Sequence, residues 1–417
     1  MVFLDLEPYF VWSQISILGY RIYTATILLA TLYMAWTVLH KKLKLHGSVP
    51  LQNVGSISVE LLFLSMGILL LLLYQFFISG VATETAQPFN MAMICINLGL
   101  MLFSVQDHHM LRTVFRRCKT IFAITLVPSL VFYLLGLVGI EMPTVILDAE
   151  EGRALSNQYY ELILGIAVRI RHTYSNLNRI CGIYREPGFI GTIGALFLAG
   201  DRFNLKKREN QIIAVSCVCT FSLAFYLLVA IGFVATRLGK IRNRRRAINA
   251  LSGVVAILLI YVIFMSVPFA DGTPLDTLQE RLIITETGLS GDNRFGDSIA
   301  AMNAYDQFIR GDFITVLFGY GSDNRVIQGT EMSIWQKVCS YKEYIFQFGM
   351  VGFVILVSWL ISMVRLKYRN IPETKKWSVM VLLMVFLISI YQRPDVVRFH
   401  YFCLLFGGAS NLALSEE

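Results

Sequence analysis

The sequence predicts an all-α, polytopic integral membrane protein, and three observations lead to that fold class. First, 56% of the 417 residues are apolar and only 15% are charged, against about 25% charged in an ordinary soluble domain. Second, the apolar residues gather in runs, many of them near the ~20 residues that a helix needs to cross a bilayer. Third, the basic residues cluster in short stretches between these runs. Together the observations exclude a soluble enzyme, a disordered chain and a nucleic-acid-binding protein.

Ten apolar runs carry the prediction of spanning helices. With one of them broken in two, they predict about 11 membrane segments, or 12 if residues 2–12 form another. The whole chain, residues 1–417, is then a single membrane domain with two long polar loops, residues 141–186 and residues 271–343. The runs are residues 15–39, 57–80, 89–105, 121–140, 187–200, 212–235, 247–270, 344–364, 377–391 and 396–412.

Charge assigns the loops to the two sides of the membrane. Five basic clusters with their flanks hold 22 of the 36 Lys and Arg residues and only four acids, so their net charge is +18. The rest of the chain carries −10, which gives the total of +8. Cytoplasmic loops retain Lys and Arg, so we expect all five clusters inside and both long loops outside. The clusters are residues 41–44, 112–119, 202–208, 237–246 and 365–376.

The apolar run 212–235 has a basic cluster on each side, so a single crossing would place one cluster on the wrong face. At about 36 Å of helical rise the run is also too short for two full crossings. We therefore expect a re-entrant hairpin or two short helices that turn near residues 220–222, with one tilted helix as the alternative. A broken helix at this depth has to be buried in protein or line a wet cavity.

The two external loops contain arginines, although positive-inside bias disfavours basic residues there. Guanidinium groups bind phosphate and carboxylate bidentately. The loops therefore predict a site for a polyanion such as the pyrophosphate of a lipid carrier, the alternative being salt bridges to acids of the same loops. The arginines are Arg153, Arg169, Arg171, Arg179 and Arg185 in loop one, and Arg281, Arg294, Arg310 and Arg325 in loop two.

Local patterns place some of these arginines on predicted elements. Residues 159–170 read as an amphipathic interfacial helix just before Arg171. Residues 297–309 read as a second amphipathic helix that ends at Arg310, where the cation could instead complement the helix dipole. The spacing Arg-x10-Gly occurs in each loop, from Arg171 to Gly182 and from Arg310 to Gly321.

Glu186 and Pro187 are helix start signals ahead of the apolar run 187–200. They belong to the sequence Gly-Ile-Tyr-Arg-Glu-Pro-Gly of residues 182–188, which resembles a signature of O-antigen polymerases of the Wzy class. Asn293-Arg294-Phe295, Leu-Phe-Gly-Tyr-Gly of residues 317–321 and the stretch 341–352 look like later segments of the O-antigen ligase and polymerase superfamily. The resemblance covers roughly residues 90–410.

The resemblance implies a GT-C-like membrane fold and a metal-independent glycosyltransferase without a cofactor. Such an enzyme acts at the periplasmic face of the bacterial inner membrane, where it transfers a glycan from undecaprenyl pyrophosphate to another lipid-linked repeat unit. The arginines would neutralise the leaving pyrophosphate, and a general base would accept the proton of the acceptor hydroxyl. The implied site comprises Arg171, Arg185, Arg294 and Arg310 for pyrophosphate, Tyr320 and Tyr341 for sugar, and Glu186 and Glu343 as candidate bases.

The related ligases carry a His just before the span near Tyr344, where this chain has Val-Cys-Ser-Tyr at residues 338–341. Its absence favours polymerase over ligase and leaves the choice of base open. The implied partners are the undecaprenyl-pyrophosphate-linked oligosaccharide and membrane lipid, together with a chain-length regulator and a flippase of the same pathway. Nucleic acid is not expected. A polysaccharide flippase is the alternative from another class, for which charges inside the spans would be typical.

Overall fold

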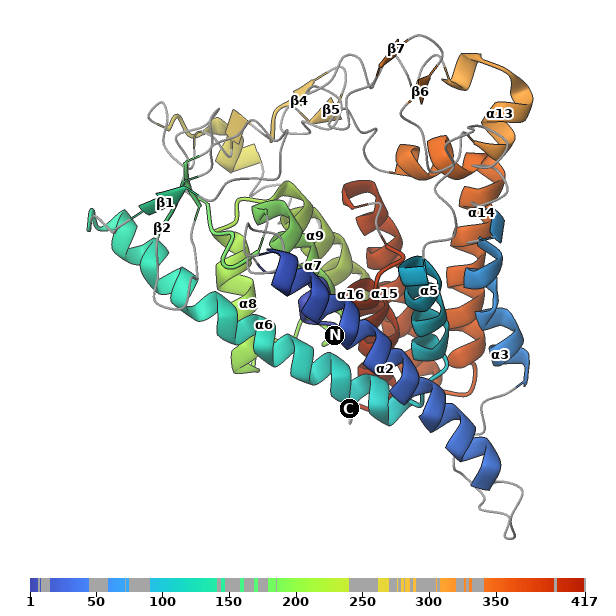
Figure 1. Ribbon diagram of the computed structural model, residues 1–417. Helices are drawn as coiled ribbons and strands as arrows, with labels where there is room; N and C mark the ends of the chain where they lie inside the picture. Colours follow the sequence, from blue (N-terminus) through green and yellow to red (C-terminus); the bar gives the residue numbers. More distant parts are fainter. Residues whose placement is uncertain are drawn as a thin grey trace.

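Helices dominate the computed structural model (Figure 1), and within the described residues three of them are long and apolar enough to cross a membrane. These are His108–Leu137, Tyr344–Lys367 and Glu373–Gln392. Shorter apolar helices, Cys95–Ser104, Pro187–Ala199 and Leu223–Leu238, pack among them. The mostly helical, membrane-protein character of the prediction is thus confirmed. The structure describes residues 1–6, 8, 16–44, 59–71, 73–74, 91–140, 144–146, 158–160, 169–171, 179–184, 186–239, 262–269, 276, 279–280, 282–285, 288–289, 305, 308–319, 326–327, 330–331, 341–393 and 396–415.

A short 3-10 turn, η1 (Leu4–Leu6), lies at the start of the chain. The helices described between it and residue 140 include α2 (Ser16–Lys44), α3 (Val59–Ser65), α5 (Met91–Ser104) and α6 (His108–Leu137). Asp107 caps α6 by accepting the backbone N–H of Met110 at 2.7 Å. Helix α6 begins 13 residues before the predicted run 121–140, so the basic cluster 112–119 forms its first turns rather than a loop.

Contacts between the ends of helices define a common basic end of the bundle. Lys367, at the end of α14 (Tyr341–Lys367), donates to the carbonyls of Ser104 and Gln106 between α5 and α6, each at 2.7 Å. Arg369 pairs with Glu60 of α3 at 3.1 Å. The basic clusters around residues 112, 207 and 369 therefore meet at one end, as the charge pattern predicts.

The apolar run 212–235 forms two short helices, α8 (Arg208–Val218) and α9 (Leu223–Leu238). The chain breaks between them at Phe221, which has φ 47°. Both outer ends lie at the basic end, since the side chain of Asn210 accepts from Lys119, and Trp377, in the first turn of α15 (Glu373–Gln392), donates to the carbonyl of Ala235. The predicted break into two short helices near residues 220–222 is confirmed, and both arms pack against α7 (Pro187–Ala199).

Helix α7 is the centre of the bundle, and 11 of its 13 residues are buried. Its glycines allow close packing, because a Cβ on Gly194 would lie 2.3 Å from the sulfur of Cys217 in α8, and one on Gly191 would lie 2.7 Å from Ser222 beside α9. The ring of Phe197 in α7 also packs against the rings of Phe115 and Phe122 of α6, at centroid distances of 5.4 and 5.2 Å.

Helix α14 bends sharply at Gly349, where φ is 68° and ψ is 178°. The ring of Tyr341 consequently lies only 6.2 Å from that of Phe353, although a straight helix would separate them by about 18 Å. The short helix α13 (Phe313–Phe318) abuts the bend at the top of α14 (Figure 1). Tyr74 fastens the two together by donating to the carbonyls of Phe318 at 3.1 Å and Phe348 at 2.7 Å.

The last predicted run, 396–412, is one helical rod with a π-helical turn in its middle. It consists of α16 (Phe399–Phe402), the π-helix η3 (Cys403–Gly407) and α17 (Gly408–Ala413). All 15 residues of the rod are buried, and Asn411 near its end donates to the carbonyl of Gly200 at 2.9 Å. The rod thus runs from the end of α15 back to the basic end.

Short strands occur in the two long loops, which corrects the expectation of a purely helical chain. In loop one β1 (Thr144–Ile146), β2 (Gln158–Tyr160) and β3 (Arg169–Arg171) form an antiparallel sheet. The predicted amphipathic helix 159–170 is therefore wrong at both ends, because Tyr159 pairs with Arg169 of β3 and with Val145 of β1, and Tyr160 pairs with Thr144. Strand pairing suits aromatic side chains. In loop two the strands are β4 (Ile284–Thr285), β5 (Gly288–Leu289), β6 (Val326–Ile327) and β7 (Thr330–Glu331).

Candidate active site

The N-terminus of α7 carries an ion pair between Glu186 and Arg393. Glu186 occupies the N-cap position with Pro187 next in the chain, as the sequence predicts, but its side chain makes no cap hydrogen bond. Its carboxylate instead binds the guanidinium of Arg393, which follows the last turn of α15. The Glu186 and Arg393 side chains remain 36% and 23% exposed. The pair is therefore within reach of a substrate at this end of the bundle.

Two residues of the first turn of α7 shape this pair. Gly188 leaves room for it, because a Cβ there would lie 3.3 Å from a terminal nitrogen of Arg393. The guanidinium of Arg393 lies over the ring of Phe189, 5.9 Å from its centroid. A cation over an aromatic face is attracted by the ring quadrupole, so Phe189 and Glu186 together fix the position of the charge.

Phe189 also contacts His400 of α16, with 5.5 Å between the two ring centroids. Nδ1 of His400 lies 2.7 Å from the carboxylate of Asp5, and both side chains are 2% exposed. The same carboxylate oxygen accepts the backbone N–H of His400 at 2.8 Å, and the other oxygen accepts the hydroxyl of Tyr23 at 2.5 Å. A buried carboxylate–imidazole pair thus lies beside the Glu186–Arg393 pair.

The charge state of Asp5 follows from these contacts. Burial alone would raise the pKa of its carboxyl, but His400, Arg398 and the hydrogen bond from Tyr23 outweigh burial and hold the pKa well below its ordinary value. Asp5 is therefore an anion, and it can only accept hydrogen bonds. The N-terminal segment is held in place at a second point by an antiparallel bridge between Pro8 and Tyr184.

The bent arm of α14 brings predicted residues to the same end of α15. The ring of Tyr341 lies 6.0 Å from that of Tyr391, two residues before Arg393. The hydroxyl of Tyr344 accepts the backbone N–H of Val396 at 3.2 Å. Glu186 and Tyr341, both predicted site residues, therefore gather around the connection between α15 and α16.

The other predicted site residues do not join this cluster among the residues that the structure describes. Arg310 lies at the end of a helical turn that stops at Gly311, as predicted, and it is exposed. Phe308 anchors that turn by stacking on Phe346 of the arm. Arg171 ends strand β3, and Glu343 lies in the first turn of α14. Arg185, Arg294 and Tyr320 lie outside the described residues.

One of the external arginines has a structural role. Arg179 donates to the carbonyls of Thr220 at 2.7 Å and Phe221 at 3.3 Å, in the break between α8 and α9. These carbonyls lie at the break between the two helices, and the guanidinium satisfies them in place of helical N–H groups. Gly182, the glycine of the first Arg-x10-Gly spacing, adopts φ 54° nearby, a conformation that favours glycine.

Sequence reasoning missed Arg393, Asp5 and His400. Arg393 sits between two apolar runs and outside both long loops, where positive-inside bias makes an arginine conspicuous. His400 lies within the apolar run 396–412, and Asp5 lies 395 residues away in the chain. The signal that could have found the pair is an ionisable residue inside an apolar run, which commonly marks a functional site with a partner.

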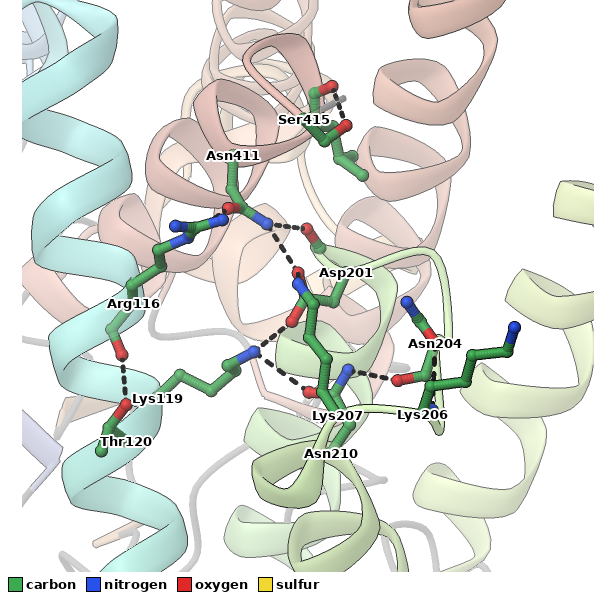
Figure 2. A network of polar contacts seen from close by, with 12 residues as sticks. Arg116, Lys119, Thr120, Asp201, Asn204, Lys206, Lys207, Asn210, Asn411 and Ser415 are labelled. Carbon is green, nitrogen blue, oxygen red and sulfur yellow. Dashed lines mark hydrogen bonds and ion pairs between the residues drawn. The ribbon is translucent and has the colours of Figure 1, made fainter. Parts of the chain in front are cut away.

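A second polar cluster occupies the basic end of the bundle (Figure 2). Asp201, just after α7, binds the ammonium groups of Lys119 and Lys207, the latter at 2.8 Å. Asn411 of α17 donates to the same carboxylate at 2.7 Å and accepts from Arg116 of α6 at 3.1 Å. The network joins α6, α7 and α17 through mutually satisfied polar groups, as expected of a structural contact.

Within the described part of the chain, no three His, Cys, Asp or Glu side chains come together in a way that could hold a metal ion. The chemistry of the described site is that of the Glu186–Arg393 ion pair, the Asp5–His400 carboxylate–imidazole pair and aromatic rings. Comparison of the chain with family models, with curated proteins and with solved structures gave no match.

Proposed function

We propose that the protein is a glycosyltransferase of the bacterial inner membrane that polymerises lipid-linked O-antigen repeat units at the periplasmic face. The donor is a glycan on undecaprenyl pyrophosphate, and the acceptor is a hydroxyl of another lipid-linked repeat unit. The observation that carries the proposal is the Glu186–Arg393 pair at the N-terminus of α7, at the end of the bundle opposite the basic clusters. This end would face the periplasm if the basic end is cytoplasmic.

In this proposal Arg393 binds the pyrophosphate that leaves the donor. A guanidinium binds phosphate oxygens bidentately and stabilises the negative charge that develops on the leaving group. Glu186 keeps the guanidinium in place between substrates, and the helix dipole of α7 adds positive potential at the same point. Arg171, Arg185, Arg294 and Arg310 remain predicted contacts for pyrophosphate, and Tyr320 and Tyr341 for sugar.

Deletion of the gene followed by gel analysis of lipopolysaccharide tests the reaction. A polymerase is required for the polymer ladder but not for capping the core with one repeat unit, so we expect the ladder to vanish and the single-unit band to remain. Loss of the single unit as well would indicate a ligase or a flippase. A ladder that survives deletion would contradict the proposal.

Complementation of the deletion strain tests the role of Arg393. We expect Arg393→Ala to give no ladder and Arg393→Lys to give a much weaker one, because an ammonium group lacks the planar fork of the guanidinium. The control is Arg369→Ala, which removes an arginine from an exposed ion pair with Glu60 and should leave the ladder intact. Full ladders from both Arg393 variants at normal protein levels would refute this role.

A lipid-linked glycan flippase is the second candidate function, and one observation favours it. Lys119 is buried within α6, one of the three helices that could span a membrane, and pairs there with Asp201. Ionisable groups inside spans are typical of transport pathways. The same gel distinguishes the two functions, since a flippase is needed for the single-unit band and a polymerase is not.

A further inference from the structure

Asp5 determines which nitrogen of the His400 ring carries hydrogen. A carboxylate has no hydrogen to give, so Nδ1 of His400 has to be the donor across the 2.7 Å contact. In the neutral imidazole the other nitrogen, Nε2, then presents a lone pair. Nε2 is buried, and among the described residues no group donates a hydrogen bond to it. The pair therefore holds a basic nitrogen whose acceptor capacity is unused.

This nitrogen belongs to the same site as the anion-binding guanidinium. The centroid of the Phe189 ring lies 5.5 Å from the centroid of the His400 imidazole and 5.9 Å from the guanidinium carbon of Arg393. Glycosyl transfer with inversion needs one group on the nucleophile and another on the leaving group, on opposite sides of the reacting carbon. In inverting glycosidases these two groups are about 6.5–9.5 Å apart, a separation that two partners of one aromatic ring can provide.

On the basis of the proposed function, we propose that Asp5 and His400 are the proton-accepting pair of the glycosyl transfer. A lone pair of the acceptor oxygen forms the bond to the anomeric carbon, while the bond from that carbon to the pyrophosphate oxygen breaks. Its electron pair leaves with the pyrophosphate, which Arg393 holds. The proton of the acceptor hydroxyl passes to Nε2 of His400, and the anion of Asp5 stabilises the imidazolium until the proton returns to water.

The surroundings of His400 suit a transient positive charge. The charged and titratable groups around the pair are Asp5 from η1, Tyr23 from α2, Arg398 just before α16, and Tyr401 on α16. Asp5, the anion among them, contacts the ring directly. The rings of Phe189 and Tyr401 flank the imidazole, with centroids 5.5 and 4.4 Å from its own.

The test measures chain elongation in membranes that carry the full-length protein. Lipid-linked repeat units extracted from the deletion strain serve as both donor and acceptor. His400→Asn keeps an amide N–H near the Nδ1 position and so can retain the bond to Asp5, but it removes the base. His400→Gln and Asp5→Asn provide two further variants, and His108→Asn is the matched control. His108 is a half-buried imidazole at the basic end, where Nδ1 lies 3.2 Å from the hydroxyl of Ser410.

We expect His400→Asn to lower the elongation rate by about 10²- to 10⁴-fold, the usual contribution of a general base. The KM for the lipid-linked donor should stay within a few-fold of wild type, because Arg393 is intact. The loss should therefore appear in kcat at a normal protein level. A purely structural role would instead lower the protein level or raise KM, without a selective fall in kcat.

Two results would overturn the proposal, and they differ. If wild-type membranes elongate chains and any of the three variants, present at wild-type level, keeps the wild-type rate, the pair is not the proton acceptor and the proposed function stands. If wild-type membranes give no elongation, the glycosyltransferase function itself fails and the role of His400 fails with it. A loss of rate in His108→Asn equal to that in His400→Asn would also refute a specific role.

Discussion

At the scale of single residues, Asp201 shows how a charge is tolerated inside an apolar bundle. Its side chain is 2% exposed and that of Lys119 is 5% exposed, and the carboxylate also binds Lys207 and Asn411. Burial would raise the pKa of the Asp201 carboxyl, but the two ammonium groups outweigh burial and lower it. The contact stabilises the fold only while the buried charges of Asp201 and Lys119 are paired, because a buried charge without a partner costs far more free energy than a neutral side chain.

We therefore expect Asp201→Asn to destabilise the folded protein by about 3–5 kcal/mol, the usual cost of removing one partner from a buried ion pair. The control is Glu373→Gln, which removes an exposed pair with Lys376 and should cost less than about 1 kcal/mol. Thermal unfolding of both variants in detergent measures the difference. Equal midpoints for the two variants would show that the Asp201 contact adds no stability.

The direction of the pKa shift also predicts a pH dependence. The folded protein keeps the Asp201 carboxyl deprotonated to a lower pH than the unfolded chain does, so the stabilisation is complete above the ordinary pKa of about 4. It is lost as the pH falls through the lowered value. The thermal midpoint of the wild type should thus fall more steeply than that of Asp201→Asn when the pH is lowered from about 4 toward about 3.

At the scale of elements, the bend in α14 positions Tyr341 over the end of α15. The bend depends on two glycines whose backbones touch. A Cβ on Gly349 would lie 2.0 Å from the carbonyl oxygen of Leu317, and a Cβ on Gly319 would lie 2.4 Å from that of Gln347. Both glycines also have positive φ, which L residues adopt at a cost. A side chain at either position would be strained by the backbone conformation and would also clash with backbone atoms across the contact.

Gly349→Ala should therefore displace α13 from the bend, because it combines backbone strain with a clash against backbone atoms that cannot move aside. Gly139→Ala is the matched control, since Gly139 has φ 86° but no atom within 4 Å of the position that its new methyl group would occupy. We expect Gly139→Ala to cost about 1–2 kcal/mol and Gly349→Ala clearly more, with faster trypsin cleavage after Arg310. Identical unfolding midpoints and cleavage rates would show that the contact is not needed.

The hairpin of α8 and α9 predicts a sidedness that labelling can measure. Leu205, before α8, and Leu238, at the end of α9, are 53% and 44% exposed. With cysteine at either position, in a background that lacks reactive thiols, a membrane-impermeant maleimide should react only after the inner membrane is opened. A single crossing would expose one of the two sites from the outside, so labelling from opposite faces would refute the hairpin in the membrane.

At the scale of the whole molecule, the features predictable from the sequence are those set by composition along the chain. Apolar runs located the helices, and the basic clusters on both sides of residues 212–235 indicated the break that Phe221 makes. Glu186 was recognised from its place before Pro187. In each case a few neighbouring residues determine the outcome, so the pattern is readable without knowledge of the packing.

The remainder depends on distant residues meeting. The pairing of Asp5 with His400 joins the two ends of the chain, and Arg393 acquires its role only because the start of α7 faces the end of α15. The predicted helix at residues 159–170 gave way to strands since sheet pairing, a non-local contact, overrode the local amphipathic pattern. Periodicity along the sequence carries no information about such partners.

The burial of α7 has a consequence for how the protein is made. At 13 residues this helix is about 20 Å long, well short of the ~30 Å hydrocarbon core, and none of its residues is exposed. Alone in lipid it would place Glu186 and Asp201 near the acyl chains at its two ends. Stable insertion of α7 therefore has to wait for α8, α9 and α15, and the translocation machinery has to hold it until those later segments have been synthesised.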